Sequence, residues 1–154
     1  MTGSVVIVGS INVDETLPVS GWPSPGETML LTGPISTGLG GKGANQAVAA
    51  SLAGADVRFV GAVGDDAGGD RVLDALVARG VDVASVRRVT GATTGRATIL
   101  LHPDGENLIL VAPGANAELA PSDIRAAREA IASVDALLVQ GEVTAEVIDA
   151  AADV

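Results

Sequence analysis

The chain has 154 residues, of which 47% are hydrophobic, and a formal net charge of −10 at pH 7. The apolar share supports one core of ordinary size, while the acidic balance argues against a general nucleic-acid-binding or anionic-membrane-binding surface. The absence of cysteine excludes disulfides and thiolate metal sites. No apolar run reaches the ~18 residues that span a bilayer. The composition therefore favours a cytoplasmic protein.

The chain opens with a predicted buried strand that leads into polar residues. Residues 4–9 form a short continuous apolar run that ends at a glycine, a pattern typical of a buried parallel strand. Asn12 and Asp14 follow, so we expect two polar side chains just past the carboxyl end of this strand. Residues 16–24 contain several prolines and are predicted to be irregular, whereas residues 27–37 are predicted to form an exposed strand.

A glycine cluster at residues 38–43 precedes a predicted helix at residues 44–52, which Gly54 should end. Glycines leave no Cβ atoms to keep a ligand away from the backbone, and a helix N-terminus presents unpaired N–H groups that suit hydroxyls and anions. Lys42, the only lysine of the chain, lies inside the cluster although a cation there opposes the helix dipole. The cluster therefore predicts close approach of the backbone to a small polar ligand.

Strands and helices alternate along the rest of the chain. A turn that contains Asp65 and Asp66 should lead into the next helix and cap it. The Pro-Asp-Gly turn at residues 103–105 is a hairpin signal. From apolar periodicity and turn residues we expect strands at 56–63, 94–101, 106–111 and 135–140, helices at 70–79 (ended by Gly80) and 122–132, and a final helix capped by Thr144.

This alternation predicts an α/β fold with a mainly parallel sheet covered by helices. Two segments, at about 14–37 and 94–112, break the alternation and are predicted to form a small β layer beside that sheet. Ligands of open parallel sheets bind outside the carboxyl ends of the strands. Asn12, Asp14 and Glu142 are among the polar residues expected at that edge, beside the glycine cluster, so the sequence predicts a site for a polyhydroxyl ligand.

Two nucleotide-binding motifs come close to the glycine cluster but do not fit it. Gly38, Gly40 and Gly43 have the spacing of the dinucleotide fingerprint. That motif must follow the first strand directly and needs an acid at the end of the second strand, whereas Asp56 begins its strand. A P-loop requires glycine where Ser36 stands and serine or threonine directly after the lysine, where the chain has glycine.

The glycine cluster instead resembles the signature of the ribokinase family of carbohydrate kinases, the PfkB-like kinases. The matching stretch is Gly-Gly-Lys-Gly-Ala-Asn-Gln-Ala at residues 40–47, and the segments 9–14, 25–28 and 113–117 also resemble the family, in the same order along the chain. The resemblance implies that the sugar contacts Asn12, Asp14, Gly40, Gly41, Lys42, Asn45 and Glu142. It also implies that the β layer is a lid that covers the sugar and pairs two subunits as a homodimer.

The resemblance further implies an activity that this chain can carry only in part. Enzymes of the family use Mg²⁺ and a monovalent cation to transfer the γ-phosphate of ATP to a hydroxyl of a small sugar. The leading substrate is ribose, which would give ribose 5-phosphate. Family members are about twice as long, within the usual range for such domains. Residues 1–154 should therefore be the N-terminal part of a single ribokinase-like α/β domain. The C-terminal half of the fold, which is absent, carries the Gly-Ala-Gly-Asp signature with the catalytic aspartate, and most of the ATP and cation sites. No catalytic or metal-binding residue is assigned in this chain, which we expect to bind sugar but to turn over poorly or not at all.

Two other interpretations stay open. The chain could be a non-catalytic sugar-binding or dimerising fragment, or part of a kinase for another sugar or a nucleoside. In a fragment the strand at 135–140 would lack neighbours, so we expect poor solubility or a partner that completes the sheet. Three further positions carry weaker expectations. His102 should be exposed in its turn, residues 87–88 should form a solvated face, and Trp22 should either cover the sugar or pack against the lid.

Overall fold

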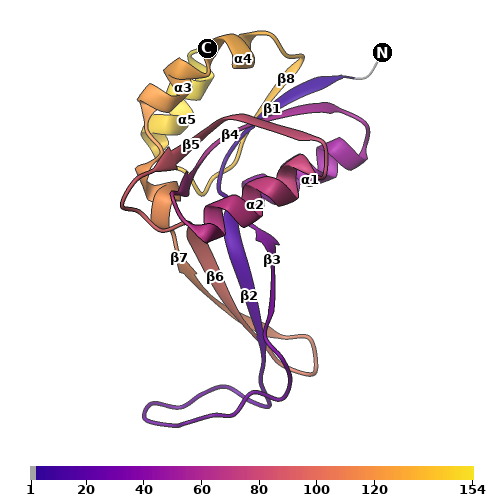
Figure 1. Ribbon diagram of the computed structural model, residues 1–154, viewed down its shortest axis with the longest axis vertical. Coiled ribbons are helices and arrows are strands. Elements are labelled where there is room, and N and C mark those ends of the chain that lie inside the picture. The colour runs from indigo at the N-terminus through magenta and orange to yellow at the C-terminus, as the bar shows by residue number, and fades with distance from the viewer. Residues whose placement is uncertain (1–2) are drawn as a thin grey trace.

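The chain folds around a parallel sheet, as a computed structural model of residues 3–154 shows (Figure 1). Within these residues the structure has two four-stranded sheets. The strands of the first sheet run parallel to one another in the order β5-β4-β1-β8. Their bounds are Ser4–Val8 for β1, Asp56–Gly64 for β4, Val81–Val89 for β5 and Ala136–Val139 for β8.

Helices cover both faces of this first sheet. They are α1 (Lys42–Leu52), α2 (Ala67–Val77), α3 (Pro121–Ala126), α4 (Arg128–Ala132) and α5 (Ala145–Ala152). Because successive side chains of a strand point to opposite faces, Val6 and Val8 of β1 pack with residues of α3, α4 and α5, whereas Ile7 packs with residues of α1 and α2. The predicted α/β fold with a helix-covered parallel sheet is confirmed. Across residues 3–154, none of these helices is long and apolar enough to cross a membrane.

The second sheet projects away from the first, below it in Figure 1. Its strand order is β3-β2-β6-β7, in which β2 and β6 are parallel and the two outer pairs are antiparallel. The strands are β2 (Asn12–Pro18), β3 (Ser36–Gly40), β6 (Gly95–Leu101) and β7 (Asn107–Ala112), and a short 3₁₀ helix, η1 (Gly114–Glu118), follows. The hairpin predicted between β6 and β7 is present.

Two sequence predictions about the second sheet are wrong. The irregular segment predicted at 16–24 begins later, because β2 continues to Pro18, where a strand end tolerates the missing N–H. The exposed strand predicted at 27–37 is absent from most of that range, which is irregular up to the start of β3 at Ser36. β3 then includes the first glycines of the cluster. Pairing of β3 with β2 imposes the extended backbone on glycines, which have little strand preference of their own.

Two further differences concern the first sheet and its helices. The sequence analysis did not predict β5, which includes residues 87–88. These two arginines were expected to form a solvated face, but both form ion pairs. Arg87 Nε lies 2.9 Å from Asp123 Oδ1, and Arg88 Nη2 lies 2.7 Å from Asp70 Oδ1. The helix predicted at 122–132 is divided at Ala127 into α3 and α4. Long-range pairing with β4, which is not encoded locally, forms the edge strand β5.

The helix ends follow their predicted signals. Gly54 and Gly80 have φ values of 91° and 76° after α1 and α2, the left-handed conformation that ends many helices. Asp66 is the N-cap of α2, and its carboxylate accepts a hydrogen bond from the backbone N–H of Gly69 at 2.8 Å. Thr144 occupies the N-cap position of α5, but its side chain makes no capping hydrogen bond.

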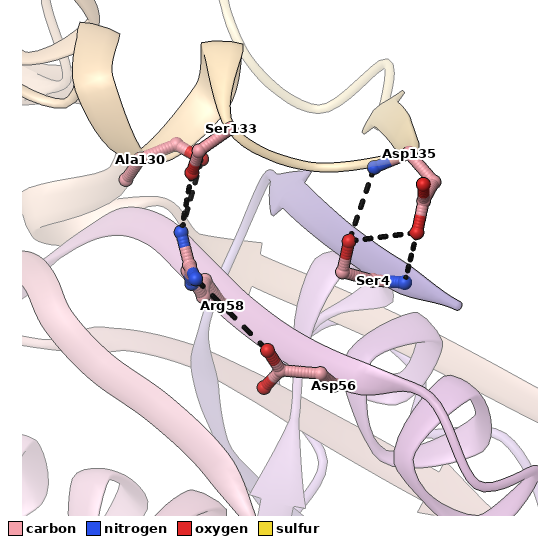
Figure 2. A network of polar contacts seen from close by, with 6 residues as sticks. All are labelled: Ser4, Asp56, Arg58, Ala130, Ser133 and Asp135. Carbon is pink, nitrogen blue, oxygen red and sulfur yellow. Dashed lines mark hydrogen bonds and ion pairs between the residues drawn. The ribbon is translucent and has the colours of Figure 1, made fainter. Parts of the chain in front are cut away.

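A polar network fastens the edge of the first sheet where its strands begin (Figure 2). Asp135, just before β8, accepts hydrogen bonds from the backbone N–H and the hydroxyl of Ser4 at 2.8 and 2.9 Å. Arg58 of β4 donates to the hydroxyl of Ser133 at 2.7 Å and to the carbonyl oxygen of Ala130 at 3.4 Å. These contacts hold β1 and β4 to the α4–β8 connection, so the opposite edge, where the strands end, is left free to form a site.

Candidate functional site

A cavity of about 200 Å³ lies between the second sheet, the N-terminus of α1 and the segment after β8. Its polar lining consists of residues that the sequence predicts to bind a ligand, and its apolar lining comes from β6 and β7. The polar residues are Asn12, Asp14, Gly41, Lys42, Asn45 and Glu142, and the apolar residues are Ala97, Ile99, Ile109 and Val111. Every candidate site residue except Gly40 thus lines the cavity, and Gly40 lies directly beside Asp14.

Asn12 and Asp14 lie past the end of β1, as predicted, and reach the cavity from β2. Alternate residues of a strand share a face, so the strand holds these two side chains next to each other. In the register of the second sheet, Asp14 lies between Gly38 of β3 and Ala97 of β6. Neither neighbour has a large side chain, which leaves room beside the carboxylate.

Gly40 and Gly41 act through the space that they leave free. A Cβ atom at Gly40 would lie 1.9 Å from Cγ and from Oδ1 of Asp14, so the carboxylate occupies the place that any side chain would need. Gly41 is the N-cap of α1 and has a φ of 89°, and a Cβ there would lie 2.7 Å from the carbonyl oxygen of Ser10. Gly41 therefore lets α1 start at Lys42, two residues earlier than predicted, with its first N–H groups close to the cavity.

The carboxylate of Asp14 has no partner within the described part of the chain. Its Oδ1 atom is buried and accepts no hydrogen bond from any of residues 3–154. Burial raises the pKa of Asp14, nearby Glu142 raises it further, and Lys42 opposes the shift. A buried acceptor without a donor is costly, so this oxygen is suited to a ligand that brings a donor.

Glu142 is held in the site by two donors. It forms an ion pair with Lys42, and its Oε2 accepts a hydrogen bond from the hydroxyl of Ser10 at 2.6 Å. Burial raises the pKa of Glu142, but the hydrogen bonds from Lys42 and Ser10 outweigh it and hold the pKa below its ordinary value. Glu142 is therefore a fixed carboxylate, whereas Lys42, whose side chain is 70% exposed, can move.

The site combines acceptors, donors and an apolar wall in one small cavity. Asp14 and Glu142 supply carboxylate acceptors, Asn12 and Asn45 supply amides that both donate and accept, and Lys42 supplies a cation. The aliphatic side chains of β6 and β7 give a surface that suits the carbon skeleton of a ligand. This arrangement suits a small polyol better than an apolar molecule or a highly charged one.

Sequence reasoning missed several residues that shape the site. Ser10 is buried and orients Glu142, and Asn116 of η1 is buried beside Asn12. A second cavity of about 320 Å³, lined in part by Ser10, Asn12, Asn116 and Glu142, adjoins the first. Ser10 and Asn116 both lie in segments that resemble the family, at residues 9–14 and 113–117. That resemblance was the signal by which the sequence could have marked them as part of the site.

Three weaker candidates lie elsewhere. Asp66 accepts hydrogen bonds from the backbone N–H and the hydroxyl of Thr94 at 2.9 and 2.6 Å, so besides its predicted role as a cap it ties α2 to the start of the second sheet. The rings of Trp22 and His102 are 5.8 Å apart, and neither residue lines the cavity. Trp22 therefore contacts the turn between β6 and β7. His102 is less exposed than expected, because Trp22 and Asp104 contact it.

Comparison with known proteins identifies relatives along the whole chain. The profile described as "pfkB family carbohydrate kinase" matches residues 2–154. Curated relatives include a ribokinase of Bacillus subtilis, 41% identical over 146 residues, which are 95% of this chain and 49% of the relative. A ribokinase of Staphylococcus aureus is 38% identical over 143 residues, 93% of this chain and 47% of the relative. The chain thus spans about half the length of the curated relatives that it matches.

Solved structures give the same result. A ribokinase of Thermotoga maritima superposes with a TM-score of 0.82 and 34% identity, covering 95% of this chain and 48% of the other. A ribokinase of Arabidopsis thaliana, solved with ribose and ATP, superposes with a TM-score of 0.80 and 32% identity, covering 98% of this chain and 50% of the other. The family resemblance read from the sequence is confirmed.

Proposed function

The chain belongs to the pfkB family of carbohydrate kinases, and on that premise we propose that it is the sugar-binding half of an ATP-dependent sugar kinase. The proposed substrate is D-ribose, and the proposed product is ribose 5-phosphate. Ribokinases among the relatives and solved structures support this choice, and the cysteine-free composition favours the cytoplasm as the place of action.

The observation that carries the proposal is the carboxylate of Asp14, whose Oδ1 has no donor among residues 3–154, beside the amide of Asn12 in a small cavity. A sugar hydroxyl both donates and accepts, so a pair of vicinal hydroxyls can donate to Asp14 and accept from Asn12. Glu142 and Asn45 can hold further hydroxyls, and the backbone at Gly41 can approach closely because no side chain intervenes. Charge-assisted hydrogen bonds of this kind are the strong ones.

The second sheet would act as the lid of the site. Ile99, Ile109 and Val111 line the cavity together with Asp14, so a sugar held by Asp14 would lie against an aliphatic wall. A closed lid excludes water, which strengthens the hydrogen bonds inside and reserves the phosphate for the sugar hydroxyl. Residues at about 14–37 and 94–112 would thus form the lid of a single domain.

The described residues bear on where Mg²⁺ and ATP would bind in a complete kinase. Among residues 3–154, no three His, Cys, Asp or Glu side chains come together to hold a metal ion. Lys42, the cation that lines the cavity, is already paired with Glu142. Because the chain spans about half the length of its relatives, we propose that ATP, Mg²⁺ and a monovalent cation are bound largely by other parts of a complete kinase, which would also carry the catalytic residue.

Calorimetric titration with D-ribose tests the proposed site. We expect saturable binding by the wild-type chain and a large loss with Asp14→Ala, while Glu15→Gln, which alters the next carboxylate on the other face of β2, should bind normally. Titrations with 2-deoxy-D-ribose and adenosine separate ribose from the other substrates that the family admits. A folded chain that binds none of these ligands would remove the sugar-binding proposal.

A second assay separates a sugar-binding half from a complete enzyme. With Mg²⁺, ATP and ribose, we expect this chain alone to form little or no ADP above background. Ribose-dependent ADP formation at the rate of an ordinary kinase, with kcat of about 1–100 per second, would show that the chain is catalytically complete.

We also propose that the second sheet pairs two subunits. The residues of β7 alternate between its two faces, yet Leu108, Ile109, Leu110 and Val111 are all apolar and between 42% and 58% exposed. An edge strand that is apolar on both faces favours burial of its outward face against a partner. Light scattering after size exclusion should show a dimer that Leu110→Lys weakens and Leu52→Lys, at an exposed position of α1, does not. A monomeric wild-type chain at high concentration would contradict the dimer.

A further inference from the structure

Asn116 makes a set of buried contacts that the proposed sugar site does not by itself require. Its side chain is 6% exposed and lies in η1, far along the chain from Asn12. Its Oδ1 accepts a hydrogen bond from the backbone N–H of Ile11 at 2.9 Å. Its Nδ2 donates to the carbonyl oxygen of Ile11 and to Oδ1 of Asn12, both at 2.9 Å.

These contacts determine which way both amides point. The N–H of Ile11 can only donate and its carbonyl can only accept, so the oxygen of Asn116 must face the N–H and the nitrogen must face the carbonyl. The second N–H of Asn116 then points at Asn12, which must turn its oxygen toward it. The NH₂ group of Asn12 is left for the cavity, next to the carboxylate of Asp14.

The backbone beside the two amides leaves the space that their contact needs. A Cβ atom at Gly95, the first residue of β6, would lie 2.2 Å from Nδ2 of Asn116 and 2.3 Å from Oδ1 of Asn12. The hydrogen bond between the two amides therefore passes directly over Gly95. On the other side, Ala115 is fully buried and its N–H donates to the carbonyl of Thr93 at 2.8 Å, which fixes η1 against the start of β6.

We infer that Asn116 is a positioning residue that fixes the amide of Asn12 as a hydrogen-bond donor toward the sugar. The inference rests on the proposed function for the identity of the ligand, but not for the orientation of the amide. Asn12 then gives the site a hydrogen-bond donor beside the carboxylate acceptor of Asp14. A pair of neighbouring sugar hydroxyls fits this arrangement, because one hydroxyl can accept from Asn12 while the other donates to Asp14. A carboxylate at position 116 accepts but does not donate, so Asn12 would rotate to donate to it and would present its oxygen to the cavity.

Side-chain amide exchange measured by NMR tests the orientation without any ligand. In the wild-type chain, of 15.2 kDa, both amides are buried, but only Nδ2 of Asn116 donates hydrogen bonds within residues 3–154, so we expect its protons to exchange more slowly than those of Asn12. In Asn116→Asp a proton of Asn12 should become protected. Asn107→Asp, the same charge change at an exposed position of β7, should leave the exchange of both amides unchanged. Exchange at Asn12 as slow as at Asn116 in the wild type, or no further slowing at Asn12 in Asn116→Asp, would overturn the inference, and the wild-type result stands even if the variant does not fold.

Titration with D-ribose then tests the consequence. We expect ribose to shift the Asn12 amide signals of the wild type, and Asn116→Asp to bind at least about tenfold more weakly, since an oxygen replaces a donor. Equal ribose affinity of wild type and Asn116→Asp would refute the positioning role. If the wild type does not bind ribose, the proposed function fails, while the exchange data still decide how Asn116 orients Asn12.

Discussion

Replacing Asp14 by asparagine should weaken ligand binding and stabilise the free protein at the same time. In the free chain the carboxylate is partly buried, its Oδ1 has no donor among residues 3–154, and its neighbour Glu142 is also an acid. Asparagine has nearly the same shape but no charge, so it removes the cost of burying an unpaired anion. The substitution also removes the charge that would hold sugar hydroxyls.

The sizes of the two effects follow from the environment of Asp14. An unpaired buried polar group costs about 1–3 kcal/mol, and since Asp14 is only partly buried we take the low end, about 1 kcal/mol of stability gained. In a chain of this length that raises Tm by about 2–4 °C. A hydrogen bond to a charged group contributes about 1.5–3 kcal/mol, so losing one should weaken ribose binding roughly 10- to 150-fold.

The effect of pH separates this explanation from a general change in stability. The pKa of Asp14 is raised in the folded protein, so folding favours the protonated side chain. The stability that protonated Asp14 contributes is fully present below the pKa of the unfolded state, and it is lost as pH rises through the pKa of the folded state. The stability gain of Asp14→Asn should therefore be present at neutral pH and vanish in acid. Wild-type ribose affinity should fall as pH is lowered through the same pKa, and that of the variant should not.

Thermal unfolding and calorimetric titration of the wild type, Asp14→Asn and Glu15→Gln give all of these quantities. Glu15 is the matched control, because it lies on the opposite face of β2 and pairs with Arg96 at 3.0 Å. A variant that is less stable than the wild type at neutral pH would refute the reasoning about the unpaired oxygen. Unchanged ribose affinity in Asp14→Asn would refute the placement of the sugar.

Three further outcomes are expected from single substitutions. Gly40→Ala should weaken ribose binding at least about tenfold, because its Cβ would displace the carboxylate of Asp14. The control Gly38→Ala, on the same strand, places its Cβ where no atom lies within 4 Å, so it should bind ribose normally. Equal ribose affinities of the two variants would show that Asp14 can move freely. Asp66→Ala should lower the free energy of unfolding by about 1–3 kcal/mol in calorimetry, whereas Asp65→Ala should change it little. Because the pKa of Asp66 is lowered in the folded protein, the stability difference between wild type and Asp66→Ala should shrink as pH falls through that pKa. A stability difference that does not depend on pH would contradict the role of the Asp66 carboxylate. Arg58→Ala should lower stability by about 1 kcal/mol through the contacts in Figure 2 and leave ribose affinity unchanged, so any loss of binding would show that the far edge of the sheet is coupled to the site.

Most of the first sheet and its helices could be predicted from local sequence. Continuous apolar runs indicate the strands at residues 4–9, 56–63 and 135–140, because a strand buried on both faces must be apolar throughout. Glycines in left-handed conformation end the first two helices at Gly54 and Gly80, and these depend only on a local steric rule. Such features need no knowledge of distant residues.

The candidate site was predicted in part, and by resemblance more than by physics. Composition and polar strand ends indicated a polyhydroxyl ligand near Asn12, Asp14 and Glu142, but the seven-residue set came from the family signature. The structure then showed what the sequence could not: that Asp14 fills the space beside Gly40, and that Ser10 holds Glu142 in place. Both are contacts between segments that the sequence does not mark as neighbours.

The sequence by itself therefore determined the type of fold and most helix ends, and it predicts the chemical character of the ligand, because each depends on residues close together in the chain. Only the tertiary structure decided that the glycine cluster begins in β3, that residues 81–89 form an edge strand, and that Asn116 orients Asn12. Strand pairing and buried hydrogen bonds join residues far apart in sequence. Their geometry is set by how the whole chain packs, since local preferences for strand structure are weak and the pairing partner determines the outcome.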